Sequence, residues 1–240
     1  MIITAESERT DSSLERDLAP GFPRKQPEAC RLAGLARPRL RGLGGPSDQA
    51  PSEPRHDRFF GVQAHFGQYR PGVDKLLDVI RNAGIGWIRD EVYWSEVEKE
   101  KGVFRFPPSY DYYLEAARSR RLEALLILDF GNALYTGSDK RAPATGPELQ
   151  AFGRYCREVV THYSPRGVRH FEIWNEPNAS TFWKPQPNPE DYVRLLEVVY
   201  RVCKEADPEA TVLGCSTAGV DLDFIGRVMR AGGVRIAPAA

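Results

Sequence analysis

From Phe59 onward, apolar positions follow two different periods, which take turns along the chain. Short apolar or alternating runs predict strands, and segments with apolar residues three and four positions apart predict amphipathic helices. The predicted strands are 59–66, 87–94, 123–130, 168–176 and 211–216, with a candidate sixth beginning at 234–240. The predicted helices cover about 73–84, 110–120, 147–163, 189–206 and 221–230.

The helix predicted at 189–206 has the clearest boundaries. Asn188 is a suitable N-terminal cap, Pro189 suits the first helical position, and Glu190 and Asp191 favour the positive end of the helix. An apolar stripe then runs through Tyr192, Leu195, Leu196, Val199, Val202, Cys203 and Ala206. This stripe predicts one face packed against a sheet or another helix.

Alternating strands and helices predict parallel strands joined by right-handed crossovers. Such strands form either an open doubly wound sheet or a closed eight-stranded barrel. Open sheets usually carry a glycine-rich phosphate loop after the first strand, but the first strand here ends in AHFGQYRPG. Polar and aromatic residues gather instead after each strand, as at the active-site rim of barrel enzymes: His65, Arg89, Trp94, Asp129, Asn132, Asn175 and Glu176. The α/β fold class predicted is therefore a (β/α)8 barrel of which five to six units are present.

Residues 1–57 differ from the rest of the chain. They contain seven of the prolines, the sequence GLGGPS and the arginine-rich run RLAGLARPRLRG, and no helical or alternating period persists. This composition predicts a disordered N-terminal segment, 1–57, followed by a barrel domain at 58–240. Removal of the first segment is expected to leave the barrel domain folded.

Charge and composition narrow the function classes. Lys and Arg together number 33, as do Asp and Glu, so there is no surplus of positive charge for nucleic acid. No apolar run is long enough to span a membrane, and the first residues lack the apolar centre of a secretory signal. The four cysteines show no paired spacing typical of metal sites, and no nucleotide-binding loop is present. We expect neither a cofactor nor a bound metal.

The segment FEIWNEPN, at 171–178, carries the clearest chemical signal. Strand alternation places Glu172, Trp174 and Glu176 on one face, which points into the barrel if the opposite face packs against helices. A carboxylate buried there is costly without a partner, so Glu172 is expected to pair with a cation. Pro177 cannot continue the strand, so the chain turns and Glu176 lies at the rim. A carboxyl group partly withdrawn from water beside an aromatic ring can hold a proton near neutrality and donate it.

This segment resembles the acid/base motif of the clan A glycoside hydrolases, whose fourth strand ends in Asn-Glu. The form WNEPN is typical of glycoside hydrolase family 39, which includes β-xylosidases and α-L-iduronidases, and family 5 enzymes end the same strand in a similar Asn-Glu-Pro. The resemblance extends by strand order from about Phe59 to Ile225. It implies a retaining glycoside hydrolase acting on a carbohydrate, in a secreted or periplasmic setting, although this chain shows no signal peptide.

By position, the resemblance makes Glu176 the general acid/base. It makes Asn175 the partner of the sugar 2-hydroxyl, although strict alternation turns Asn175 to the opposite face, so a bulge or twist is required. Arg89 matches the second-strand arginine that contacts the nucleophile. His65 is a candidate for a sugar hydroxyl, and Trp94, Trp183 and Phe182 are candidate stacking surfaces.

The second carboxylate of a retaining mechanism ends the seventh strand in the resembled clan, and no residue here matches it. A full barrel takes about 250 residues, more than 58–240 provides. Three interpretations remain open. The chain is part of a glycosidase, inactive alone, that is incomplete at its C-terminal end; a carbohydrate-binding barrel or pseudoenzyme fragment without the chemistry; or a half-barrel that assembles with another chain. The sugar, the linkage and the oligomeric state are not predicted.

Overall fold

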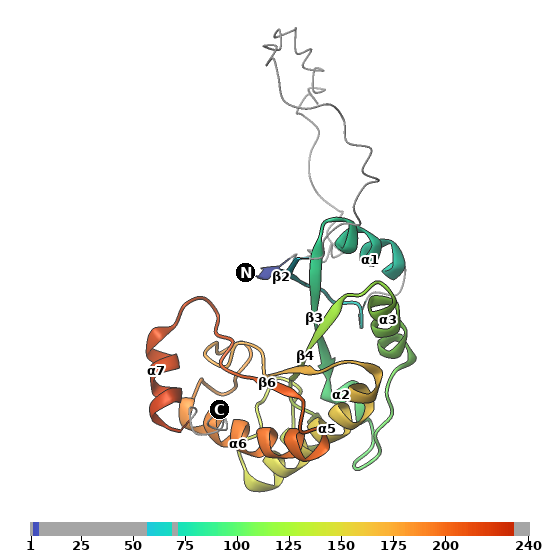
Figure 1. Ribbon diagram of the computed structural model, residues 1–240. Coiled ribbons are helices and arrows are strands. Elements are labelled where there is room, and N and C mark those ends of the chain that lie inside the picture. Colours follow the sequence, from blue (N-terminus) through green and yellow to red (C-terminus); the bar gives the residue numbers. More distant parts are fainter. Residues whose placement is uncertain (1, 5–56, 69–71, 233–240) are drawn as a thin grey trace, which may run out of the picture. The chain divides into compact units, whose positions relative to one another are not determined.

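The computed structural model describes residues 2–4, 57–68 and 72–232. These contain one parallel sheet whose strands lie in chain order, β1 to β6 (Figure 1). The strands are β1 Ile2–Thr4, β2 Asp57–Gln63, β3 Ile85–Tyr93, β4 Glu123–Asp129, β5 His170–Ile173 and β6 Thr211–Leu213. The strands β2 to β6 are the five that the sequence predicts.

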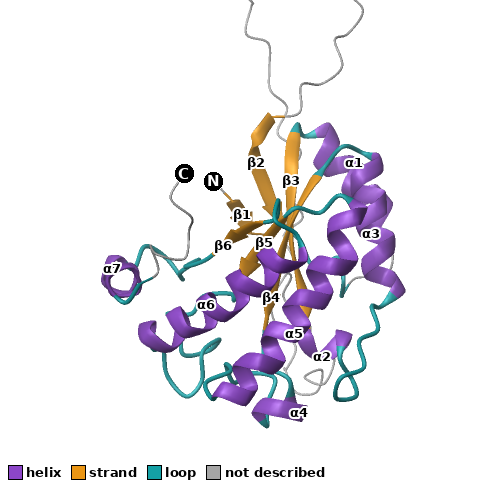
Figure 2. Ribbon diagram, turned by 60° about the horizontal axis from the view of Figure 1, so that its bottom comes forward, coloured by secondary structure: helices purple, strands orange, loops and turns teal. Residues whose placement is uncertain are grey.

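Helices connect the consecutive strands from β2 to β6, and Figure 2 shows α1, α3, α5 and α6 along one face of the sheet. The longer helices are α1 Val73–Asn82, α3 Pro108–Ser119, α5 Gly146–Tyr163, α6 Pro189–Ala206 and α7 Leu222–Arg230. All five are predicted. The short helices α2 Trp94–Val97 and α4 Ala133–Thr136 and the 3-10 turn Ser164–Arg166 are not, because a single turn leaves no apolar period.

This arrangement confirms a partial (β/α) barrel. Every strand pair is parallel, and in the described part of the chain β6 pairs with β5 alone, so the sheet does not close. The short strand β1 pairs with β2 in a region where the sequence predicts only disorder. The remainder of the predicted disordered segment, 5–56, and the candidate sixth strand at 234–240 lie outside the described residues.

The two faces of the sheet carry different side chains. The helix-facing positions of β3 to β5 are apolar and buried, including Ile88, Leu126 and Phe171. The opposite positions carry most of the charge: Arg89 and Glu91 on β3, Asp129 on β4 and Glu172 on β5. Because parallel strands end at the same edge, the groups after their carboxyl ends meet at one rim.

Caps fix where the helices begin. The side chain of Asn188 accepts hydrogen bonds from the backbone N–H groups of Glu190 and Asp191, at 3.0 and 3.1 Å, which confirms the predicted cap of α6. Helix α5 begins with a capping box formed by Thr145 and Glu148. The pattern Thr-x-x-Glu signals such a box, so the sequence alone indicates a cap at Thr145 for this helix.

Candidate active site at the carboxyl ends of the strands

The chain leaves regular strand geometry immediately before the candidate acid/base. Strand β5 ends at Ile173, three residues earlier than predicted, and Trp174 and Glu176 both have left-handed backbone angles, with φ of 66° and 47°. Non-glycine residues adopt this conformation only where the surrounding structure enforces it, and such positions cluster at functional sites. The required twist at the strand end is therefore present, on both sides of Asn175.

The twist at the strand end turns Trp174 away from the face on which strict strand alternation places it with Glu172. The indole ring of Trp174 lies 5.8 Å from the ring of Phe152 on α5 and 5.3 Å from that of Trp183, and its Nε1 donates to the carbonyl of Phe182. The prediction that Trp174 shares the barrel-interior face with Glu172 is wrong, because the left-handed backbone turns its side chain into the apolar layer.

Arg89 connects three strands. Its Nε donates to Glu172 Oε2 at 2.8 Å and its Nη2 to Glu172 Oε1, while Nη1 donates to Gln63 Oε1 and Nη2 also donates to Asn175 Oδ1 at 3.1 Å. Burial opposes the charge of Arg89, but the hydrogen bonds and charge of Glu172 leave its pKa raised above the ordinary value. The expected pairing of Glu172 with a cation is confirmed. Gln63 is a partner that the sequence analysis missed.

Glu176 lies just past this network, partly exposed. Its backbone N–H donates to Ser216 O at 3.1 Å, beyond the end of β6, and its carbonyl accepts from Ala179 N at 2.9 Å. Its carboxylate has no hydrogen-bond or ion-pair partner within 57–68 or 72–232. The backbone is thus fixed between two strand ends while the carboxylate remains available to a ligand.

His65 follows β2 and faces a carboxylate of the next strand. Its Nδ1 lies 3.3 Å from Glu91 Oε2, and the same oxygen accepts a hydrogen bond from the Tyr93 hydroxyl at 2.5 Å. The contact with Glu91 raises the pKa of His65, against the opposing effect of partial burial. Gln68 donates in turn to Tyr93, so this polar group extends to the exposed surface.

Two further carboxyl groups near the rim are buried. Asp129 is fully buried and neither of its oxygens has a hydrogen-bond partner in the described parts of the chain. Burial, together with the charge of Glu91, raises its pKa well above the ordinary value. Asp90 faces the helices and accepts backbone hydrogen bonds from Phe66 and Glu91, both at 2.8 Å; burial raises its pKa to about 7.

The two predicted stacking tryptophans belong to the core. Trp94 is 0% exposed, stacks on Tyr135 with centroids 5.1 Å apart, and donates to Glu98 at 2.6 Å. Trp183 is 3% exposed and packs edge-on against Trp174. Neither ring has a face open to a sugar in this structure, which corrects the prediction for both.

The third stacking candidate, Phe182, does reach the rim, together with Tyr93 and Phe130. Tyr93, Phe130 and Phe182 are each partly exposed, with centroids 5.2 Å apart for the first pair and 6.1 Å apart for the second. Phe130, directly after β4, has a left-handed φ of 59°. The sequence signal for Phe130 as a rim residue is its place at the end of a predicted strand. Asn132, a weaker candidate, is buried and caps α4 by accepting from Leu134 N.

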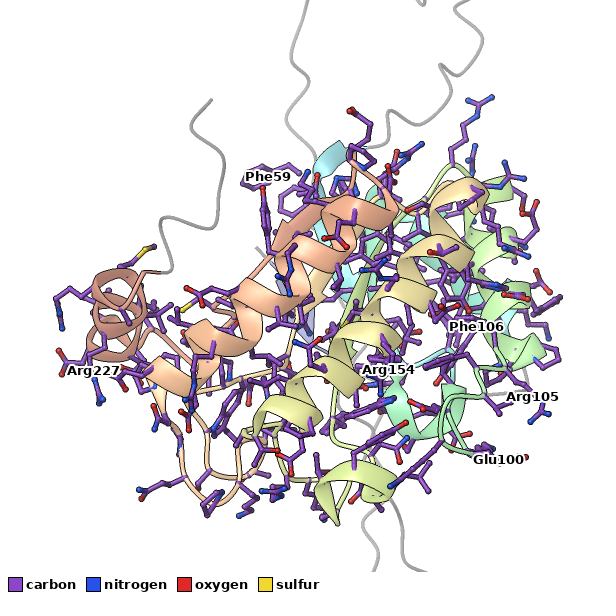
Figure 3. The ribbon with its side chains drawn as sticks, turned by 90° about the horizontal axis from the view of Figure 1, so that it is seen from below. Phe59, Glu100, Arg105, Phe106, Arg154 and Arg227 are labelled. Atoms are coloured by element: carbon purple, nitrogen blue, oxygen red, sulfur yellow. The ribbon has the colours of Figure 1, made fainter. Side chains whose placement is uncertain are left out.

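The other described surfaces provide no second candidate centre. One cleft is lined by residues of α2 and of the loop that leads to α3, including Arg105 and Phe106, which Figure 3 labels. Arg227 on α7 contacts Glu190 on α6 at 3.1 Å. Within the described ranges no group of three or more His, Cys, Asp or Glu side chains could hold a metal ion, and no helix has the length and apolar character to cross a bilayer.

Comparisons with known proteins agree with the fold. The structure resembles a family 39 glycoside hydrolase from the gut symbiont Bacteroides cellulosilyticus WH2, with a TM-score of 0.64 and 27% identity over 73% of this chain and 36% of that one. It also resembles a monomeric β-xylosidase from Caulobacter crescentus CB15, with a TM-score of 0.59 and 22% identity over 77% of this chain and 41% of that one.

A comparison of sequences also finds a glycosidase. A β-xylosidase of Geobacillus stearothermophilus is 40% identical over 73 residues, which are 28% of this chain and 14% of that protein. No family model matches the chain. The chain therefore spans about two-fifths or less of the structures above and a small part of the curated relative.

Proposed function

We propose that this chain, a clan A glycoside hydrolase by its fold and its relatives, carries the acid/base side of a retaining glycosidase, with Glu176 as the general acid/base. One observation carries the proposal. The carboxylate of Glu176 has no partner in the described residues. Its backbone is held in a left-handed conformation at the rim of the sheet, beyond the carboxyl ends of β2, which His65 follows, and of β3, which carries Arg89. A carboxylate without protein partners, on a fixed backbone, is available to hydrogen-bond a bound ligand and transfer a proton to it.

In this mechanism Glu176 protonates the glycosidic oxygen as the bond breaks and later removes a proton from water. Asn175 binds the sugar 2-hydroxyl, an interaction that strengthens in the oxocarbenium-like transition state. His65 is placed for another sugar hydroxyl, and Tyr93 and Phe130 join Phe182 as candidate stacking surfaces in place of the two buried tryptophans.

The nucleophilic carboxylate belongs outside this chain. A retaining mechanism needs a second carboxylate roughly 5–5.5 Å from the first. The inward-facing carboxyl groups in the carboxyl-terminal halves of the described strands are already committed: Glu172 is bound to Arg89, Glu91 contacts Tyr93 and His65, and Asp129 is completely buried. None is positioned as a free nucleophile, which supports a role for strands beyond β6.

A sugar titration tests the proposal on the chain itself. Because two of the comparisons name β-xylosidases, methyl β-xyloside and xylobiose are the first ligands, followed by other glycosides. We expect NMR shift changes at His65, Asn175 and Glu176, weakened in Asn175→Ala and unchanged in a control at the surface pair, Glu205→Gln. Shift changes confined to other elements would place the site elsewhere. Binding here without turnover in a protein with a closed barrel would favour the carbohydrate-binding alternative.

A further inference from the structure

We propose that Glu172 is a positioning residue: by clamping Arg89 it fixes the side-chain amide of Asn175, with the oxygen held by Arg89 and the NH2 group left for a ligand. Glu172 is 3% exposed and does not reach the surface. It acts through two hydrogen bonds to Arg89, and Arg89 then reaches Asn175 at 3.1 Å. The chain of contacts leads from the barrel interior to the residue beside the candidate acid/base.

Hydrogen-bond chemistry sets the direction of the amide. A guanidinium group has donors and no acceptor, so the atom of Asn175 that faces it must be the carbonyl oxygen Oδ1. The nitrogen Nδ2 then points away from Arg89, and it has no hydrogen-bond partner in 57–68 or 72–232. Asn175 is partly exposed, so this NH2 group is available.

Glu172, and not Gln63, binds the nitrogen atom of Arg89 that also contacts Asn175. Glu172 binds Arg89 through Nε and Nη2, while Gln63 binds Nη1. Nη2 is the atom that also holds Asn175. Arg89 lies on β3 and Glu172 on β5, so the pair crosses β4, where the register places Leu125 beside Arg89 and Ile127 beside Glu172. An apolar strand beneath the pair excludes water, and a bidentate contact fixes the plane of the guanidinium.

The consequence for recognition rests on the proposed function. An amide that presents only N–H donors selects a ligand atom that accepts a hydrogen bond, such as the oxygen of a sugar hydroxyl. Without the clamp the amide is free to rotate and to offer either end. We therefore expect Glu172 to affect discrimination at one sugar position, beyond any effect on stability.

The first test needs no ligand. In the wild-type chain, NMR should show slow exchange of the Arg89 Nε–H and a single environment for the Asn175 side-chain NH2. Glu172→Gln should speed the exchange by about tenfold, as expected for loss of one charge-assisted hydrogen bond, and should shift or broaden the Asn175 signals. Glu148→Gln is the matched control, because Glu148 is also buried and paired with an arginine but lies at the start of α5.

A charge-swapped double variant separates position from stability. Gln63→Glu with Glu172→Gln keeps the net charge around Arg89 and moves the carboxylate to the Nη1 side. We expect this double variant to recover most of the stability lost in Glu172→Gln. We do not expect it to restore the wild-type NMR signals of the Asn175 side-chain NH2. Recovery of the Asn175 signals as well would mean that only charge balance matters, and unchanged signals in Glu172→Gln would mean that Arg89 needs no clamp. Either result would overturn the proposal.

A sugar titration completes the test. Wild type should bind methyl β-xyloside about fivefold more tightly than its 2-deoxy analogue, the effect of one hydrogen bond, and Glu172→Gln should lose that preference. Retained preference in Glu172→Gln would contradict the proposal. If wild type bound neither sugar, the proposed function would fail, while the exchange and amide signals would still decide the role of Glu172.

Discussion

Arg89 Nη2 donates a hydrogen bond to Asn175 Oδ1 across 3.1 Å, joining the third strand of the sheet to the turn after the fifth. The bond exists because the backbone at Trp174 turns left-handed and brings Asn175 to the face that carries Glu172. The candidate acid/base, Glu176, follows directly. The site is thus organised around an arginine that itself has no contact with Glu176 in the described structure.

Arg89→Lys should destabilise the chain by roughly 3 kcal/mol. Lysine keeps the charge but not the planar group that holds Glu172, Gln63 and Asn175 together, so buried polar atoms lose partners. The measurement is the free energy of unfolding in urea. Arg141→Lys is the control, because the Arg141 side chain is 36% exposed against 13% for Arg89 and should cost less than about 1 kcal/mol. Equal losses in both variants would argue against a special role for Arg89.

The order of the elements could be predicted because it depends on local information. Periodicity, the cap at Asn188 and the proline at 189 specify α6, and the structure places it within these bounds. The Asn-Glu-Pro motif likewise placed Glu176 after the correct strand. The predicted pairing of Glu172 with a cation followed from the cost of burying a lone carboxylate.

The site's side-chain directions could not be predicted, because they depend on tertiary contacts. Alternation gives no warning that the chain turns left-handed at Trp174, a conformation that distant packing against Phe152 stabilises. Trp94 follows a strand end, where rim residues are expected, but α2 turns it into the core. Aromatic residues at strand ends therefore need the fold before a binding role can be assigned.

Trp94 should behave as a core residue. Its ring packs against Tyr135 and Tyr155, and its N–H satisfies Glu98, so Trp94→Ala should cost about 3–5 kcal/mol of unfolding free energy. Trp94→Phe should cost less and leave sugar-induced shifts at Asn175 unchanged. Chemical denaturation and the titration described above measure both. A folded Trp94→Phe chain that no longer binds sugar would restore the stacking role.

Asp90 should make stability depend on pH in the direction opposite to most carboxylates. Its pKa rises from 3.8 to about 7 in the folded chain because burial disfavours its charge. The folded state then holds a proton that the unfolded state releases, so the contribution is fully present below pH 3.8 and is lost as pH rises to about 7. The difference in unfolding free energy between wild type and Asp90→Asn should fall by a few kcal/mol over that interval.

Asp207 provides the control for that measurement. Burial acts to raise its pKa as well, but the nearby Ser164 side chain, the backbone N–H of Glu209 and the guanidinium of Arg169 lower it overall. Its contribution is therefore present above its unfolded pKa and is lost as pH falls. The difference in unfolding free energy between wild type and Asp207→Asn should therefore rise, and not fall, as the pH rises. The same sign for both variants would contradict the assignment for Asp90.

Glu176→Gln, in a protein with a complete barrel, should impair substrates with poor leaving groups most. Protonation of the departing oxygen matters less when that oxygen is already a weak base, as in nitrophenyl glycosides, and general acid catalysis contributes roughly 10²–10⁴-fold. The measurement is kcat/KM of wild type and variant for a natural disaccharide and for a nitrophenyl glycoside. Equal losses on the two substrates would show that Glu176 is not the acid.

The 240-residue chain alone should not hydrolyse glycosides detectably, although it carries the proposed acid/base. An acid donates productively only when another group attacks or stabilises the sugar cation, and the inward-facing carboxylates Glu91, Asp129 and Glu172 are paired or buried. The outer edge of β6 also lacks a neighbouring strand in the described chain, and Leu213 on it is 39% exposed, so we expect self-association.

Release of nitrophenol from a panel of aryl glycosides measures this, with Glu176→Gln as the control. No difference between the two chains is the expected outcome, and sedimentation at several concentrations reports the association. Turnover in wild type that disappears in Glu176→Gln would point to a nucleophile within these residues or to direct attack by water. Glu91 would be tested first, because it contacts the half-buried His65 near the rim, and Asp129 second, because it would first have to become accessible. If both Glu91→Gln and Asp129→Asn retained this turnover, direct attack by water would be the remaining route.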